Sequence, residues 1–174
     1  MHEQEREQQR IAALTTTLLH APDSFSRVHA AGYLASLSQP PATAFAALVA
    51  ALGNVDQEVQ VAAARALGSY GPRAVDHLLP LLAGDPYLAM AAAEGLGQIG
   101  DERAVAPLAL ALQAAHAYHY DIAGALAQIG PPAVPALRRL LAVPDVEVRH
   151  WAGRALQDII SKHPILSVGM EDES

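Results

Sequence analysis

Apolar residues recur along this chain at helical spacing, in stretches separated by glycine, proline and aspartate. In the stretch 56–70, one helical face carries Val59, Ala63, Leu67 and Tyr70. This spacing predicts an amphipathic α-helix. Asp56 is a natural N-cap, because its carboxylate can accept a hydrogen bond from a free N–H of the first turn. Gly71 can end the helix by taking a positive φ.

The same pattern returns further along the chain. Residues 66–71 (ALGSYG) are followed by 95–100 (GLGQIG), by 125–130 (ALAQIG) and, in decayed form, by 155–160. The anchor leucines are spaced at about 30 residues, and they are Leu67, Leu96, Leu126 and Leu156. A repeat of this length is typical of a solenoid, in which each unit buries its apolar face against its neighbours.

Each break is followed by a second, leucine-rich helix, which Pro72, Asp101 and Pro131 would open. The expected inner stripes of these second helices are Val75, Leu78, Leu79 and Leu82, then Val105, Leu108 and Leu112, then Val134, Leu137 and Leu141. The prediction is an all-α, right-handed α–α superhelix of about five helix pairs and about ten helices. Residues 1–162 would form one repeat domain, capped by helices at 1–20 and 145–162, with a flexible acidic tail over 163–174.

Composition restricts the partners. The net charge is −7, and Lys162 is the only lysine, so a cationic surface for nucleic acid or an anionic membrane is not expected. The absence of cysteine excludes thiol catalysis and thiolate metal sites. The charged, glutamine-rich segment 1–10 does not resemble a signal peptide, and no apolar run reaches membrane-spanning length. We therefore expect a cytoplasmic protein.

Two segments carry a family resemblance. Residues 145–156 (DVEVRHWAGRAL) and 100–108 (GDERAVAPL) resemble the two halves of the short HEAT-like repeat of bacterial phycobilisome lyase subunits, the E–Z type. The resemblance implies a HEAT-like solenoid whose first helices line the convex face and whose second helices line the concave face. It thereby implies a concave partner-binding surface formed by Asp76, His77, Leu81, Arg103, Pro107, Leu110, Arg138 and Arg139.

The segment 116–121 (HAYHYD) departs most from the repeat. His116, His119 and Asp121 could bind a divalent metal, could form a binding hot spot, or could be a polar helix start. Asp121 falls at the edge of the buried stripe, where a carboxylate needs a partner. Arg149 or His150 on the neighbouring helix could provide one.

Trp151 is the only tryptophan, and it lies between Arg149 and Arg154. Tryptophan and arginine often dominate the energy of an interface. Trp151 could therefore be a docking or self-association residue, or it could cover the apolar edge of the last repeat.

No catalytic motif accompanies these candidates. His-Glu occurs only at His2–Glu3, whereas the HEAT-like deoxyhypusine hydroxylases repeat that pair, and no P-loop or nucleophile elbow is present. We predict a non-catalytic adaptor that binds another protein without a cofactor, as a monomer or weak homodimer. A bilin lyase-type or other chromophore-handling subunit, and a structural adaptor that self-associates through Trp151, are the alternatives.

Overall fold

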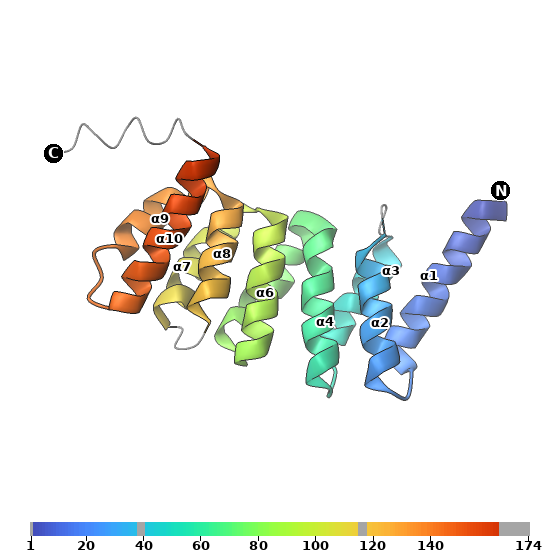
Figure 1. The fold of residues 1–174 in the computed structure, drawn as a ribbon. Helices are drawn as coiled ribbons and strands as arrows, with labels where there is room; N and C mark the ends of the chain where they lie inside the picture. The colour runs from blue at the N-terminus through green and yellow to red at the C-terminus, as the bar shows by residue number, and fades with distance from the viewer. Residues whose placement is uncertain (1, 38–40, 115–117, 164–174) are drawn as a thin grey trace.

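The helices of this protein stack in two layers. The computed structural model describes residues 2–37, 41–114 and 118–163, and Figure 1 shows their path. The first layer contains α2 (Ser24–Ala35), α4 (Gln57–Leu67), α6 (Pro86–Ile99), α8 (His119–Ile129) and α10 (Val146–Lys162). The second contains α1 (His2–His20), α3 (Ala42–Ala51), α5 (Val75–Leu78), α7 (Val105–Ala114) and α9 (Val134–Leu140).

This arrangement confirms the predicted all-α, HEAT-like superhelix. Consecutive helices alternate between the layers, so α2 to α9 form four pairs, with α1 and α10 at the two ends. The part of the chain that the structure describes contains no β-strand. It also contains no helix that is both long and apolar enough to cross a bilayer. The predicted tail lies outside the described residues from position 164 onward.

Helix starts and stops are confirmed at most of the predicted positions. Aspartates cap α4, α6 and α10, where Asp56, Asp85 and Asp145 accept backbone N–H hydrogen bonds from the first turn. The positive-φ residues among those described are glycines that follow first-layer helices, and they are Gly71, Gly100 and Gly130. Only a residue without a Cβ adopts this conformation at little steric cost.

The anchor leucines lie in the core. Leu67, Leu96 and Leu126 are completely buried, and Leu156 is nearly so. Tyr70 belongs to the same stripe, and its hydroxyl donates a hydrogen bond to the Leu34 carbonyl at 2.9 Å. Burial raises the pKa of Tyr70 to about 12.

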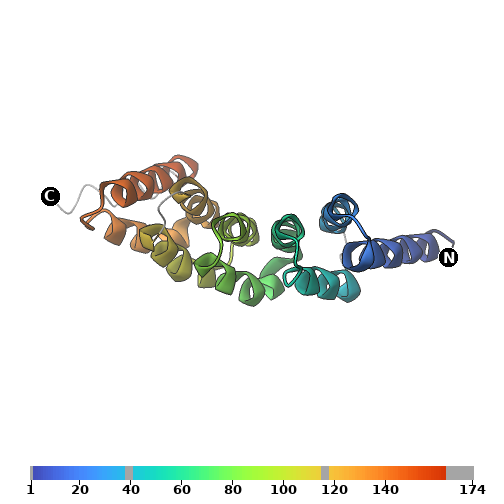
Figure 2. The ribbon, with the colours of Figure 1, turned by 90° about the horizontal axis from the view of Figure 1, so that it is seen from below.

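The curvature is opposite to the one predicted. Figure 2 shows the superhelix bending so that the first layer lies on its inner, concave side and the second layer on its outer, convex side. The physical reason is close approach in the first layer. A Cβ on Gly68 would lie 2.8 Å from the Gly95 Cα, and a Cβ on Gly97 would lie 2.8 Å from the Ala125 Cα. The second-layer helices carry leucine and proline and pack against each other less closely.

Two local predictions are also wrong. The second helix of the second pair is a short α5 between two 3₁₀ segments, η1 (Gly68–Ala74) and η2 (Leu79–Ala83). Pro80 lies in η2 and has no N–H to donate to an α-helical turn. Leu141 is 42% exposed, because α9 ends one residue earlier and Leu140 occupies the buried position.

Candidate functional site

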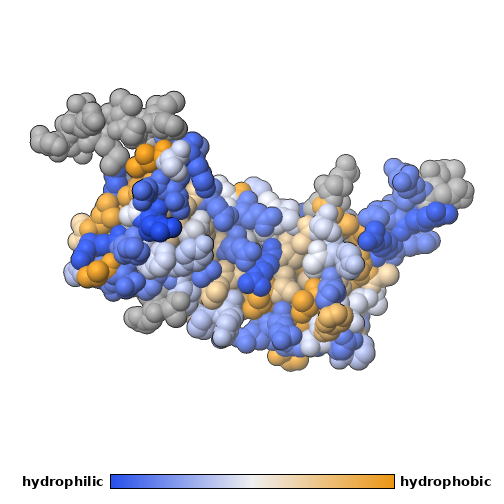
Figure 3. All heavy atoms as spheres, in the orientation of Figure 1, coloured by the Kyte–Doolittle hydropathy of each residue, from blue (hydrophilic) through white to orange (hydrophobic). Residues whose placement is uncertain are grey.

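The concave face is built from the outward positions of the first-layer helices. The repeat brings equivalent residues into rows across the face, and one row contains Gly32, Arg65, Glu94, Gly124 and Arg154. Within this row Arg65 Nε donates a hydrogen bond to Glu94 Oε2 at 2.8 Å. Figure 3 shows this face, with apolar surface over α4 and more polar surface over α6 and α10.

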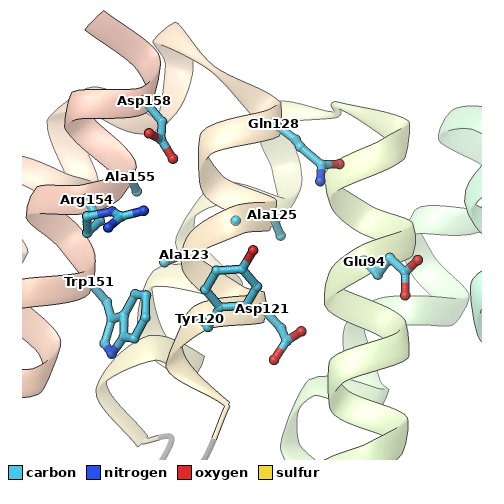
Figure 4. Close-up of a pocket in the computed structure, with 11 residues that line it drawn as sticks. Glu94, Tyr120, Asp121, Ala123, Ala125, Gln128, Trp151, Arg154, Ala155 and Asp158 are labelled. Carbon is cyan, nitrogen blue, oxygen red and sulfur yellow. The ribbon is translucent and has the colours of Figure 1, made fainter. Parts of the chain in front are cut away.

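A groove of about 210 Å³ crosses α8 on this face. Its floor is made of small residues, Ala123, Gly124 and Ala125 from α8 and Ala155 from α10. Larger side chains rise on both sides from the neighbouring helices α6 and α10 (Figure 4). The groove is therefore a shallow passage over α8.

Gly124 keeps this passage open. It lies inside α8, and a Cβ built there would meet nothing within 4 Å. Glycine inside a helix is less stable than alanine by about 1 kcal/mol, and packing does not require it here. By contrast, Gly68 at the C-cap of α4 and Gly95 and Gly97 in α6 allow neighbouring helices to approach.

Two aromatic side chains form one wall of the groove. Tyr120 and Trp151 meet edge to face, with ring centroids 5.6 Å apart and an interplanar angle of 79°. Tyr120 is 67% exposed, and the ring of His150 also packs against Trp151, with ring centroids 5.1 Å apart. Tyr120 therefore presents an aromatic surface to solvent beside the half-buried Trp151.

The charged groups of the groove are Glu94, Asp121, Asp158 and Arg154 (Figure 4). Glu94 is paired with Arg65. Within the described residues, neither Asp121 nor Asp158 forms an ion pair. The groove thus holds two unpaired carboxylates and one guanidinium.

The predicted partner for Asp121 is wrong. Arg149 donates hydrogen bonds to the carbonyls of Val143 at 2.8 Å and Pro144 at 2.6 Å, and His150 packs against Trp151. Arg149 therefore holds the loop before α10 and leaves Asp121 in the groove.

A second hollow, of about 470 Å³, lies on the same face toward the N-terminus. It is bordered by Val28, Val61, Tyr87 and Met90, with Arg65 at its rim. Tyr87 is 66% exposed. This hollow accounts for much of the apolar surface over α4 in Figure 3.

The second-layer candidates lie on the convex side. Arg103 binds Asp101 at 2.9 Å and Asp76 at 3.4 Å, and it donates to the Pro72 carbonyl at 3.0 Å. Hydrogen bonds from the Arg103 side chain and backbone lower the pKa of Asp101, and Asp101 in turn raises the pKa of Arg103. Asp76 and Arg103 therefore link successive repeats.

Three of the second-layer candidates share one hollow, and the others lie outside it. Arg103, Leu110 and Arg139 border one shallow hollow, and Leu110 is 68% exposed. The other candidates are a half-buried Leu81 and Pro107, an exposed Arg138, and His77, whose ring lies 5.6 Å from that of Phe45. Because these positions face the convex side, the predicted concave surface does not form from them.

The histidine segment is only partly described. His116 lies outside the described residues, and His119 Nε2 is buried without a hydrogen-bond partner in the part of the chain that is described. Among those residues, no three histidine, aspartate or glutamate side chains come together as metal ligands.

Of the predicted site residues, Trp151 and Asp121 are brought together in the groove over α8. Three residues of the groove were not predicted from the sequence, namely Glu94, Tyr120 and Gly124. The repeat register could have identified Glu94 and Gly124, since these two residues occupy the same row position as Arg65 and Arg154.

Comparison with known proteins agrees with this architecture. A family model described as HEAT repeats matches residues 11–87 and, overlapping these, 45–121. Together the two matches cover more than half of the chain. Comparison with curated protein sequences finds no matching relative.

Several solved structures are similar. One is a chain in the complex of CpcE and CpcF of phycocyanin lyase from Nostoc sp. PCC7120, with a TM-score of 0.66, 27% sequence identity and 89% of this chain covered. The match covers 66% of that chain, so this protein spans just under two thirds of its length. An engineered protein matches with a TM-score of 0.55 and 29% identity, covering 87% of this chain and 80% of its own.

Human deoxyhypusine hydroxylase in complex with glycerol is similar in fold alone. Its TM-score is 0.52 at 20% identity, with 95% of this chain and 80% of that chain covered.

Proposed function

Because this chain belongs to the HEAT-repeat family, we propose that it is a binding scaffold whose concave, first-layer face holds a segment of another protein. Fold alone does not determine activity, so the proposal rests on the surface. The observation that carries it is the joint presence, on one face, of the apolar hollow beside Tyr87 and the aromatic groove over α8.

This face has the features of an interface before any partner arrives. Exposed aromatic side chains at its two hollows supply contact area with little loss of conformational freedom, and charged groups at the rim supply specificity. The helices below are held by a continuous buried core. A partner would therefore meet a preformed surface, which reduces the entropic cost of binding.

Two matched variants test the proposal. Tyr87 and Leu110 are almost equally exposed, at 66% and 68%, but Tyr87 belongs to α6 in the first layer and Leu110 to α7 in the second. Partners would be captured with a photo-crosslinking residue at position 87, identified by mass spectrometry and purified for titration calorimetry. Tyr87→Glu should weaken binding about tenfold or more, as loss of an aromatic anchor does, and Leu110→Glu should leave it unchanged. The reverse pattern would place the interface on the convex side and refute the proposal.

A second candidate is a subunit of a bilin lyase-type enzyme. The similarity to a chain of the CpcE–CpcF complex supports it, as does the resemblance of the repeat itself. In this case the concave face would contact a second subunit or a chromophore. Adding a bilin to the purified protein should then shift the absorbance of the pigment. An unchanged spectrum would count against chromophore handling by this chain alone.

Self-association through Trp151 stays a prediction. Trp151 packs against Tyr120 within the groove, so a second copy would have to enter the same site. Sedimentation at several protein concentrations would detect it.

A further inference from the structure

We infer that the groove over α8 receives a positively charged side chain, arginine or lysine, from the segment that binds the concave face. The inference rests on the proposed function and adds the chemistry of the ligand at one point of the surface. Shape, aromatic surface and charge each contribute to it independently.

The shape of the groove admits a ligand from solvent. Side chains on α6 and α10 rise on either side (Figure 4), whereas Gly124, which lines the groove, leaves open space above the α8 backbone. A bound chain can therefore cross α8 closely at this point and direct a side chain toward Tyr120 and Trp151. The glycine has no packing role that would otherwise explain it.

The aromatic wall suits a cation. The face of an aromatic ring carries partial negative charge, so guanidinium and ammonium groups bind over tyrosine and tryptophan rings. In the described residues, no arginine stacks on Tyr120 or Trp151, although Arg73 stacks on Phe45 and Tyr70, and Arg10 on Tyr33. The protein thus makes this contact elsewhere, whereas Tyr120 is exposed and Trp151 half-buried with no arginine over either ring in the described residues.

The charge of the groove has the matching sign. Asp121 and Asp158 lie on opposite sides of the passage (Figure 4) and form no ion pair within the described residues. Arg154 opposes them with a single positive charge, and Glu94 adds a third carboxylate that Arg65 already binds. An anionic ligand would have Arg154 as the one positive charge of the described lining and would meet the carboxylates on both sides.

Trp151 supplies the readout, because it is the only tryptophan of the chain. The intact protein is titrated with Nα-acetyl-arginine amide, and its emission is followed at constant ionic strength. Nα-acetyl-citrulline amide is the control, since it has nearly the same shape without the charge. The emission should change to saturation, with the arginine derivative binding about three- to fivefold more tightly.

Variants separate the contributions. Asp121→Asn with Asp158→Asn should weaken binding of the arginine derivative about fivefold, and added salt should weaken it as well. Glu3→Gln with Glu102→Gln removes the same charge from exposed positions away from the groove and should have no effect. Arg154→Ala should strengthen binding. Gly124→Ala should weaken binding while raising the thermal midpoint, a combination that loss of folding cannot produce.

Equal binding of the arginine and citrulline derivatives, or equal effects of the two double variants, would overturn the inference. The two proposals remain distinguishable. If the arginine derivative fails while Tyr87→Glu still disrupts partner binding, the scaffold proposal stands without this ligand. If Tyr87→Glu has no effect on the partner, the concave face itself is excluded.

Discussion

The same substitution, glycine to alanine, should change stability in opposite directions at two positions of the first layer. Gly97 in α6 and Gly124 in α8 both lie inside helices. A Cβ at Gly97 would lie 2.8 Å from the Ala125 Cα and 3.1 Å from its Cβ, whereas a Cβ at Gly124 would meet nothing within 4 Å. One glycine allows two helices to approach, and the other faces open space.

The magnitudes follow from two effects. Alanine favours the helix and restricts the unfolded chain, which stabilises either variant by about 0.5–1 kcal/mol. At Gly124 nothing opposes this gain. At Gly97 the obstacle is the backbone of α8, so the helices must separate, and such overpacking costs about 1–3 kcal/mol. Because the first effect is common to both variants, their unfolding free energies should differ by about 1–3 kcal/mol, the cost of the lost close approach.

Urea denaturation of the two variants and the parent protein measures this difference. Far-UV circular dichroism and Trp151 fluorescence should give the same transition midpoint if unfolding is cooperative. The midpoint should rise for Gly124→Ala and should fall or stay unchanged for Gly97→Ala. Equal shifts in both variants would refute the assignment of Gly97 to helix packing, and with it the explanation given for the curvature.

Three further results are expected. Gly100→Ala should destabilise the protein by about 1–2 kcal/mol in the same assay, because Gly100 has a φ of 71°. Leu126→Ala should cost about 2–5 kcal/mol, as truncation of a fully buried leucine does, whereas Arg139→Ala should change stability by less than about 0.5 kcal/mol; near-equal effects would contradict the repeat register. Hydrogen bonds from Arg103 lower the pKa of Asp101. The stabilisation of the folded protein by these bonds is therefore present above 3.8, the ordinary pKa of aspartate, and is lost as the pH falls through the lowered pKa of Asp101. A carboxyl NMR titration should find a midpoint below 3.8 that Arg103→Ala moves upward.

Local signals in the sequence were sufficient for the helices. Asp56 caps the helix it was predicted to cap, Asp85 and Asp145 cap α6 and α10 in the same way, and Gly71 has the predicted positive φ. These signals act between residues close in the chain, through hydrogen bonds of the first turn and the freedom of a residue without a Cβ. The rule that proline has no N–H to donate was not applied to Pro80. A continuous second helix was therefore predicted where the structure has the 3₁₀ segment η2.

The site was predicted only in part. Asp121 stood out because its segment departs from the repeat and Trp151 because it is the only tryptophan, and both lie in the groove over α8. Their neighbours Tyr120 and Gly124 did not stand out, since a tyrosine and a glycine have ordinary structural roles in a helix. The predicted pairing of Asp121 with Arg149 failed because Arg149 instead binds two carbonyls of the preceding loop.

The sequence by itself therefore determined the repeat, the helices and the buried anchors, because periodic apolar positions, caps and glycine stops act locally. Only the tertiary structure decided which layer is concave. That choice depends on how closely neighbouring helices approach, through contacts such as Gly68 with Gly95 and Gly97 with Ala125, between residues almost 30 positions apart. The direction of bending determines which surface a partner can enter. The candidate site is therefore the groove over α8 and not the surface of the second-layer helices that the sequence suggested.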